Sequence, residues 1–347
     1  MHPSENEFMA GQRLMVGFDG TDFNDDLEFL IGTLRVGGLI LFSRNLDTPA
    51  QIRQLCHDCQ ECAVRCGLPP LFIAIDQEGG QVARLKPPFT QFPGNPAMKH
   101  PEDAVHFARV TAMELKPLGI NMNMAPVLDV APEGVNSIMA GRAFGGDPGW
   151  VSKMGMTVID HLQRRGIMAV AKHFPGIGRT VLDSHLALPD LEIDPKMLAD
   201  FDLMPFESAI RGNVAGIMLS HIRYTGIDPV WPASLSPTIT SDLLRRKMGY
   251  NGVVMTDDLD MGAIKPSHDI DTAISQILAA DVDIALICHK GPDIQAACER
   301  ILKSLTDSNG LRQMGRQSVE RILRLKRGYL KGNWEAEYNS CWQANQR

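Results

Sequence analysis

The stretch IMAVAKH, from Ile167 to His173, gives the clearest indication of the architecture. A run that is apolar throughout, rather than alternating, is typical of a strand buried on both faces, as in a parallel sheet. The run ends abruptly in Lys172 and His173, and the glycine-rich segment FPGIGRTVLDSHLALPD follows. We therefore expect a buried parallel strand here, followed by a loop that carries the ionisable residues Asp183 and His185.

Similar apolar runs are spread along the chain, with segments of helical periodicity between them. The predicted strands are Arg13–Phe18, Gly38–Ser43, Leu71–Asp76, Ile120–Asp129, Ile167–His173, Gly216–His221, Gly252–Asp258 and Asp283–Cys288. The clearest predicted helices are Asp103–Leu118, Trp150–Arg165, Pro195–Arg211, Thr240–Met248 and Asp271–Ala280. This alternation predicts an α/β fold, a (β/α)8 barrel of TIM type. A doubly wound open sheet is the competing architecture, but no G-x-G-x-x-G motif follows the first strand, which disfavours its dinucleotide-binding version.

The 347 residues allow one large domain or two ordinary ones, but no linker or low-complexity segment divides them. We therefore predict a single catalytic barrel domain over residues 1–347 with a helical C-terminal tail. The helical part of this tail is expected from Pro292 to Leu330. The last residues, Gly332 to Arg347, are polar with two tryptophans, and we expect them to cover a surface.

The overall composition excludes several classes of partner. The net charge of −7 provides no basic field for nucleic acid or anionic lipid. No window reaches the roughly 18 apolar residues that a membrane helix needs. The N-terminal sequence MHPSENEFMAGQ lacks the basic start and apolar core of a signal peptide. With seven cysteines, at least one is unpaired within the chain. Since no export signal is recognised, we expect reduced thiols and a cytoplasmic location. We also expect a monomer.

Four cysteines follow the C-x2-C-x2-C-x3-C spacing of iron–sulfur proteins: Cys56, Cys59, Cys62 and Cys66. The same positions form one stripe on a helix, and the segment from Thr48 to Gly67 has helical start and stop signals with no internal glycine or proline after Pro49. Cluster ligands usually come from a loop that can fold around the metal. The segment therefore favours a packed helix face, with a metal site as the alternative.

Ionisable residues gather where the predicted strands end. In a barrel the carboxyl ends of the strands meet at one mouth, where active sites lie. The ionisable residues at these strand ends are Asp76, Asp129, Lys172, His173, His221, Asp257 and Asp258. A single residue of this kind would more often cap the following helix, but five of the eight predicted strands end in such groups. The pattern predicts an active site at the mouth of the barrel.

Two classes of chemistry suit a mouth lined by Asp76, Arg84, Arg142, Lys172, His173, His185, Asp257 and Asp258. One is hydrolysis of a polyhydroxylated substrate such as a sugar, with a carboxylate as nucleophile and a second group that moves the proton. The other is metal-assisted hydrolysis with histidine and aspartate ligands. The first predicted strand ends in GFDGTD, without the histidines that metal-dependent barrel hydrolases usually carry there. This difference favours the metal-free class.

Several blocks of the sequence resemble glycoside hydrolase family 3, in particular its single-domain bacterial β-N-acetylglucosaminidases of cell-wall recycling. The blocks are IDQEGGQVAR, APVLDVAP, GRAF, KHFPGIGRTVLDSH and VVMTDDLDMGA, and they occur in the order of that family between about Met9 and Leu330. The resemblance implies a (β/α)8 barrel and removal of terminal N-acetylglucosamine from muropeptides. It also implies a covalent glycosyl-enzyme and neither a metal nor another cofactor.

The resemblance also assigns roles to individual residues. Asp257 matches the catalytic nucleophile, and His185 matches the acid/base with Asp183 as its partner. The residues that match those holding the N-acetylglucosamine unit are Asp76, Arg84, Arg142, Lys172 and His173. Asp258, beside the nucleophile, is expected to cap the following helix or to support its neighbour.

The chain departs from the family in the loop after the fifth strand, where Ile177 stands in place of a frequent histidine. This change puts the movement of the loop and its contacts with the leaving group in question. Three alternative functions remain open at this point: a β-N-acetylglucosaminide phosphorylase, a β-glucosidase-type hydrolase of the same family and a sugar-binding scaffold. The presence of both Asp257 and His185 argues against the scaffold.

Overall fold

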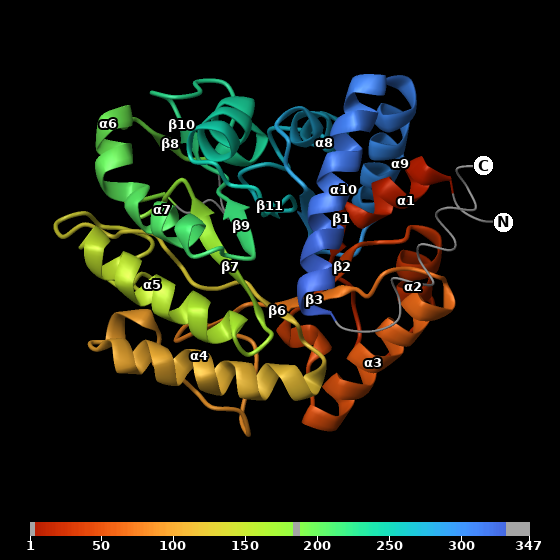
Figure 1. Ribbon diagram of the computed structural model, residues 1–347, viewed down its shortest axis with the longest axis horizontal. Helices are drawn as coiled ribbons and strands as arrows, with labels where there is room; N and C mark the ends of the chain where they lie inside the picture. The colour runs from red at the N-terminus through yellow and green to blue at the C-terminus, as the bar shows by residue number, and fades with distance from the viewer. Residues whose placement is uncertain (1–3, 183–187, 331–347) are drawn as a thin grey trace.

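The computed structural model of the protein describes residues 4–182 and 188–330. Within these residues, eight parallel strands close into a barrel in the order β1-β12-β11-β9-β7-β6-β3-β2 (Figure 1). The barrel strands are β1 (Leu14–Val16), β2 (Gly38–Leu41), β3 (Phe72–Ile75), β6 (Met122–Asn123), β7 (Met168–Phe174), β9 (Gly216–Leu219), β11 (Val253–Asp258) and β12 (Ile284–Ile287). Each lies within a predicted strand or overlaps one, so the prediction of a TIM-type barrel is confirmed.

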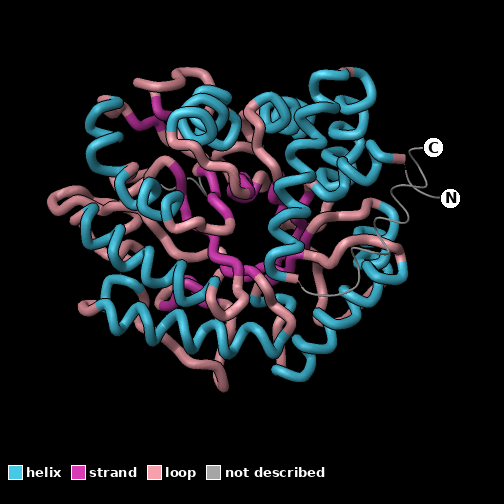
Figure 2. The backbone as a smooth tube through the Cα atoms, in the orientation of Figure 1, coloured by secondary structure: helices cyan, strands magenta, loops and turns pink. Residues whose placement is uncertain are grey.

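Helices surround the strands on the outside of the barrel (Figure 2). They are α1 (Glu5–Gln12), α2 (Asp25–Glu28), α3 (Pro49–Arg65), α4 (Pro101–Leu115), α5 (Pro148–Gln163), α6 (Pro195–Met197), α7 (Met204–Arg211), α8 (Ile270–Ala279), α9 (Pro292–Asp307) and α10 (Asn309–Tyr329). Segments of π-helix are η1 (Phe29–Thr33), η5 (Leu198–Asp202) and η7 (Thr238–Lys247), and short 3-10 turns are η2 (Ser43–Asn45), η3 (Asn95–Ala97), η4 (Lys116–Leu118) and η6 (Ala233–Leu235). None of the helices in the described ranges is long and apolar enough to cross a membrane.

Three of the predicted helices contain segments that are not α-helical, and the one over Asp103–Leu118 ends in the 3-10 turn η4. The predicted helix over Pro195–Arg211 is divided into α6, η5 and α7. Pro205 has no amide hydrogen to continue the helical ladder, and the amide of Leu203 instead bonds the carbonyl oxygen of Leu198, five residues earlier. The predicted helix over Thr240–Met248 is the π-helix η7, which begins two residues earlier. Sequence periodicity alone does not distinguish an α-helix from a π-helix over such short segments.

The four closely spaced cysteines lie on and just after helix α3. The side chain of Thr48 accepts the amide hydrogen of Gln51 and caps the helix. Cys56, Cys59 and Cys62 are buried on its inner face, whereas Cys66 is exposed at its C-terminal end. Burial raises the pKa of Cys56 to about 12, which disfavours the thiolate that a metal needs. The prediction of a packed helix face is confirmed for three of the four cysteines.

Helix α10 closes the amino-terminal end of the barrel, which we call the base. Ile322 from this helix belongs to the apolar cluster inside the barrel, together with Met15, Ile40, Phe72, Ala74, Met122, Met168, Met218, Met255 and Ile284. Lys326 is fully buried beside it; its Nζ donates to Gln12 Oε1 at 2.8 Å and lies 5.0 Å from the centre of the Phe72 ring. The barrel interior is therefore filled with side chains from its base upward.

Small additional sheets lie outside the barrel. Strands β4 (Gln77–Gly79) and β5 (Val82–Ala83) form an antiparallel pair directly after β3. Strands β8 (Asp190–Leu191) and β10 (Arg223–Tyr224) form a parallel pair in the loops after β7 and β9. Both pairs lie in loops that follow the carboxyl ends of barrel strands.

Candidate active site

A pocket of about 230 Å³ opens at the carboxyl ends of the barrel strands. The residues that line it are Ile40, Phe42, Asp76, Val82, Arg84, Arg142, Lys172, His173, Met218, Asp257, Asp258, Met261, Leu286, Cys288 and His289. The structure thus brings together all the predicted sugar-binding residues and the predicted nucleophile. Asp183 and His185, the predicted acid/base pair, lie outside the described residues, so their roles stay predictions.

Asp76, directly after β3, is held between two cations. Lys172 Nζ donates to Asp76 Oδ1 at 2.7 Å, and an Arg84 guanidinium nitrogen donates to Asp76 Oδ2 at 3.2 Å. Burial raises the pKa of Asp76, but the charges of Lys172 and Arg84 outweigh this effect and hold the pKa well below its ordinary value. Asp76 is therefore an ionised hydrogen-bond acceptor in the wall of the pocket, and substrate hydroxyls can donate to it.

Glu78 organises the opposite side of the same charged cluster, although sequence reasoning gave it no role. Its carboxylate accepts two hydrogen bonds from Arg142, Nε to Oε2 at 3.0 Å and a terminal nitrogen to Oε1 at 2.7 Å. Lys172 Nζ lies 2.7 Å from Oε1 as well. Burial raises the pKa of Glu78, but Lys172 and Arg142 lower it overall. Glu78 thus fixes two side chains that face the pocket.

His173 is oriented by Asp129, which follows β6 and is completely buried. Asp129 Oδ2 lies 2.7 Å from His173 Nδ1, while Oδ1 accepts the amide hydrogens of His173 at 3.3 Å and Ile177 at 2.8 Å. Because a carboxylate oxygen accepts, Nδ1 carries the hydrogen in this pair. In the neutral imidazole, Nε2 then offers its lone pair toward Arg142, whose guanidinium nitrogen lies 3.4 Å away.

Asp257 and Asp258 end β11 side by side but have different environments. Burial raises the pKa of Asp257, yet the neighbouring imidazoles of His173 and His221 and the amide hydrogen of Asp258 lower it below its ordinary value. Burial raises the pKa of Asp258 to about 6, and its Oδ1 accepts the amide hydrogens of Asp260 and Cys288. Asp257 is therefore the ionised carboxylate suited to nucleophilic attack, and Asp258 holds the adjacent turns.

Ile177 has an apolar environment that accounts for an apolar side chain at this position. Its side chain is buried and belongs to the main hydrophobic cluster, while its amide is bound to Asp129. The described part of the same loop is anchored further on, where Arg179 Nε donates to Asp202 Oδ2 at 2.9 Å. These contacts fix residues 177–179. The effect of Ile177, in place of the histidine frequent in the family, on contacts with the leaving group stays a prediction.

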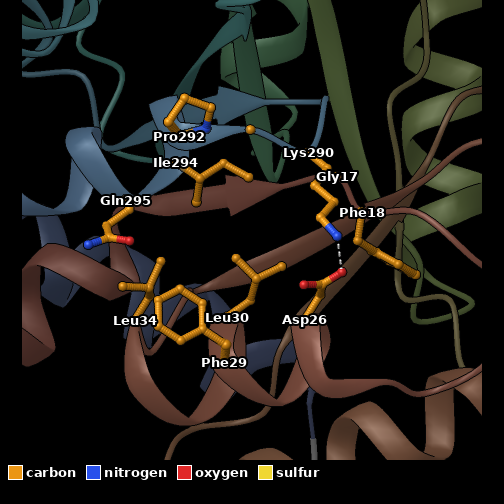
Figure 3. Close-up of a pocket in the computed structure, with 11 residues that line it drawn as sticks. Gly17, Phe18, Asp26, Phe29, Leu30, Leu34, Lys290, Pro292, Ile294 and Gln295 are labelled. Carbon is orange, nitrogen blue, oxygen red and sulfur yellow. Dashed lines mark hydrogen bonds and ion pairs between the residues drawn. The ribbon is translucent and has the colours of Figure 1, made fainter.

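A second pocket of about 180 Å³ lies between η1 and the start of α9 (Figure 3). Its walls include the apolar side chains of Phe18, Phe29, Leu30, Leu34, Pro292 and Ile294. Lys290 and Asp26 form an ion pair at its side. Because its one carboxylate is already paired, this pocket has no free acid or nucleophile among its described lining residues. The pocket at the carboxyl ends of the strands is therefore the candidate active site.

Comparisons with known proteins agree with this geometry. The sequence profile described as "Glycosyl hydrolase family 3 N terminal domain" matches residues 9–325. Beta-hexosaminidase from Nitrosomonas eutropha is 35% identical, and the match covers 90% of this chain and 91% of that protein. Beta-hexosaminidase A from Pseudoalteromonas piscicida is 34% identical over 93% of this chain, but the match spans only 61% of that longer protein. The solved structure of a family 3 beta-N-acetylglucosaminidase from Paenibacillus sp. superposes with a TM-score of 0.90 at 34% identity, over 98% of this chain and 68% of the other.

Proposed function

Because the chain belongs to glycosyl hydrolase family 3, we propose that it is a retaining exo-β-N-acetylglucosaminidase that removes terminal N-acetylglucosamine from peptidoglycan-derived muropeptides. The names of the Nitrosomonas and Paenibacillus relatives support an N-acetylhexosamine as the sugar that is removed. The muropeptide substrate and the cytoplasmic location follow from the resemblance and the composition described above. The observation that carries the proposal is the ionised Asp257 carboxylate in a pocket whose other walls are hydrogen-bonding side chains.

In the proposed reaction, Asp257 attacks the anomeric carbon and forms a covalent glycosyl-enzyme. The bond to the leaving oxygen breaks as this oxygen takes a proton from His185, which Asp183 orients. His185 then removes a proton from a water molecule, which attacks the same carbon and releases Asp257. Two displacements give net retention of configuration. A histidine suits this proton transfer because its ordinary pKa of about 6.5 lies near neutral pH.

The charged cluster around Asp76 supplies the proposed binding of the sugar. Lys172, Arg84 and Arg142 are donors, and Asp76 is an acceptor, so the cluster offers both partners that a ring hydroxyl needs. Charge-assisted hydrogen bonds of this kind are worth about 1.5–3 kcal/mol each. Asp76 bonds Lys172 and Arg84, and Glu78 bonds Arg142. The cluster is therefore organised before substrate binds.

A panel of 4-nitrophenyl β-glycosides that differ at C2 tests the proposed substrate. We expect the N-acetylglucosaminide to be hydrolysed with a much higher kcat/KM than the glucoside. A fluorinated, slowly hydrolysed β-N-acetylglucosaminide tests the proposed mechanism, because it should leave a covalent label on Asp257 that peptide mapping can locate. Preference for the glucoside would overturn the substrate, and a label on another residue would overturn the nucleophile.

A further inference from the structure

The main-chain ladder around Asp257 is irregular. Strand β11 pairs in register with β9 from Val253 to Thr256, where Thr256 lies opposite Leu219. On its other side, the register with β12 shifts between Met255 and Asp258. Such a shift is a bulge, and it leaves main-chain groups without their ladder partners. The proposed nucleophile therefore stands at a place where the sheet itself does not hold the backbone firmly.

Side chains replace the interrupted ladder bonds at this point. Thr256 Oγ1 accepts the amide hydrogen of Leu286 at 3.0 Å, and Asp258 Oδ1 accepts that of Cys288 at 2.9 Å. Both bonds tie β11 to β12. On the side of β9, His221 Nε2 lies 2.9 Å from the carbonyl oxygen of Asp258. In Figure 1, β9 and β11 are neighbours in the barrel, so His221 follows one strand and reaches the end of the next.

The hydrogen bonds of His221 define its tautomer. A carbonyl oxygen can only accept, so Nε2 carries the hydrogen that goes to Asp258. Nδ1 then accepts from the hydroxyl of Ser234 at 2.7 Å, and Ser234 is completely buried. Burial lowers the pKa of His221, although the nearby charge of Asp257 opposes the shift. The imidazole is therefore a neutral donor with both nitrogens engaged, and it is not among the described residues that line the pocket.

We infer that His221 is a positioning residue for Asp257. The residue between them in the chain of contacts is Asp258: its carbonyl oxygen is held by His221, and its amide hydrogen is donated to Asp257 Oδ1 at 2.9 Å. The imidazole thus fixes the carbonyl group of Asp258, which lies one peptide unit beyond the amide group that donates to the Asp257 carboxylate. The inference rests on the proposed function, because it assigns a role relative to the proposed nucleophile. A misplacement of about 1 Å at a reacting atom can cost around 10²-fold in rate.

Two substitutions of His221 separate its hydrogen bond from its bulk. His221→Met removes the donor and keeps an apolar side chain of similar size, whereas His221→Gln keeps an N–H donor at a similar reach. With the fluorinated β-N-acetylglucosaminide as probe, we expect His221→Met to lower the maximal rate of Asp257 labelling by about 10- to 100-fold. The probe concentration at half-maximal rate should change by less than about threefold, because the sugar-binding cluster is untouched. His221→Gln should recover most of the rate.

Tyr250→Phe is the matched control. Tyr250 is also buried, and its hydroxyl oxygen lies 3.1 Å and 3.3 Å from the carbonyl oxygens of Val214 and Val253, at the other end of the same two strands. Its loss should lower the Tm without changing the labelling rate. A maximal labelling rate in His221→Met equal to that of the wild type would overturn the inference. If His221→Met does not fold, Ser234→Ala takes its place, because it removes the hydroxyl that bonds His221 Nδ1. We expect a smaller loss of the maximal labelling rate in this variant, and an unchanged rate would overturn the inference. Failure of the wild type to label Asp257 would instead refute the proposed function.

Discussion

Glu78 illustrates how a residue behind the pocket can control the residues that line it. Its carboxylate accepts two hydrogen bonds from the Arg142 guanidinium and lies within hydrogen-bond distance of Lys172. The pair with Arg142 is bidentate, which restricts the direction as well as the position of the guanidinium. The side chain is almost completely buried. Replacement of Glu78 would therefore release two cations at once without removing either of them.

We predict that Glu78→Gln raises KM and lowers kcat/KM by about 10- to 100-fold, since charge-assisted hydrogen bonds are worth about 1.5–3 kcal/mol each. Glutamine keeps the volume and one acceptor, so a folded protein is expected with a lower Tm. Steady-state kinetics on the nitrophenyl N-acetylglucosaminide provides the measurement. Glu207→Gln is the control, because Glu207 pairs with Arg211 on the exposed surface of α7. Wild-type kinetics in Glu78→Gln would show that Arg142 and Lys172 are held by other contacts.

The two proposed functions of His185 can be separated by the leaving group. In His185→Ala, a nitrophenolate still departs without a proton, so formation of the glycosyl-enzyme should survive. Water still needs a base, so its breakdown should slow by about 10²–10⁴-fold. We expect a burst of nitrophenol equal to the enzyme concentration, followed by a slow steady state. A disaccharide substrate should lose far more activity, and Asp183→Asn should show a milder form of the pattern. Equal losses on both substrates without a burst would indicate a structural histidine.

The candidate site could be predicted only in part from the sequence. Asp257 and Lys172 stand directly at the ends of apolar runs, and their convergence follows from the parallel barrel. Glu78 stands two residues beyond a strand end, and nothing in the letters DQEGG shows that its side chain turns inward to Arg142. His221 stands at the end of a predicted strand, but its bond to a main-chain carbonyl depends on a bulge. A register shift of this kind is a property of the assembled sheet.

At the scale of single elements, the loop after β7 has the tightest packing at its beginning. A Cβ atom on Gly178 would lie 1.8 Å from the carbonyl oxygen of Val130, a contact that only a backbone shift could relieve. Asp129, the residue before Val130, holds the amide of Ile177 and the ring of His173. The loop therefore cannot move away from Val130 without disturbing the orientation of His173.

We predict that Gly178→Ala lowers kcat/KM by tenfold or more, because displacement of the loop would also turn His173. Overpacking of this kind costs about 1–3 kcal/mol, so a loss of stability should accompany it. Gly328→Ala is the control, since this exposed glycine near the end of α10 has open space around it. That variant should gain up to about 1 kcal/mol and keep full activity. Unchanged kinetics in Gly178→Ala would show that the loop tolerates displacement.

The elements themselves were well predicted where hydrophobic patterns are strong. The barrel strands were found from runs such as GLILFS and GIMLSH, which are apolar because helices and the barrel interior cover both faces. The helical tail was predicted as well, but its position under the barrel was not. Lys326 in α10 is the reason: a lysine in an amphipathic helix normally lies in water, whereas here it is buried against Phe72.

At the scale of the whole molecule, the two ends of the barrel have different roles. The mouth holds the charged pocket, and the base holds contacts that join distant parts of the chain. At the base, Asp283 accepts hydrogen bonds from Arg245 at 2.7 Å and Arg321 at 2.8 Å, which link η7 and α10 to the start of β12. Substitutions at the base should therefore change the free energy of unfolding and leave the specificity of the pocket intact.

Lys326 makes this stability dependent on pH. Burial lowers the pKa of Lys326 to about 7 in the folded protein, against about 10.4 in an unfolded chain. The Phe72 ring favours the charged amine, but the ring and Gln12 replace only part of the water that three N–H donors lose. Between these two pH values unfolding takes up a proton, so this residue makes the free energy of unfolding rise with pH, by about 1.4 kcal/mol per unit. Below about pH 7 its contribution is constant.

We predict that Lys326→Met is more stable than the wild type near pH 7 and that the difference shrinks as the pH rises. Urea unfolding of both proteins at pH 7, 8 and 9 measures the difference directly, and titrations shared by the two proteins cancel. Activity at pH 7 should be unchanged, because the residue lies at the base. A constant difference in free energy over this range would mean that Lys326 keeps its proton when buried.

The closed base has a consequence for the fate of the proposed glycosyl-enzyme. Among the described residues, α10 side chains fill the barrel from below, so a second molecule would reach the intermediate from the mouth, where the first one left. Water and a dissolved alcohol would then compete for one position above the sugar. At high alcohol concentration the enzyme would transfer the sugar to the alcohol and form alkyl glycosides in place of free sugar. The same closed barrel would then serve glycoside synthesis as well as hydrolysis.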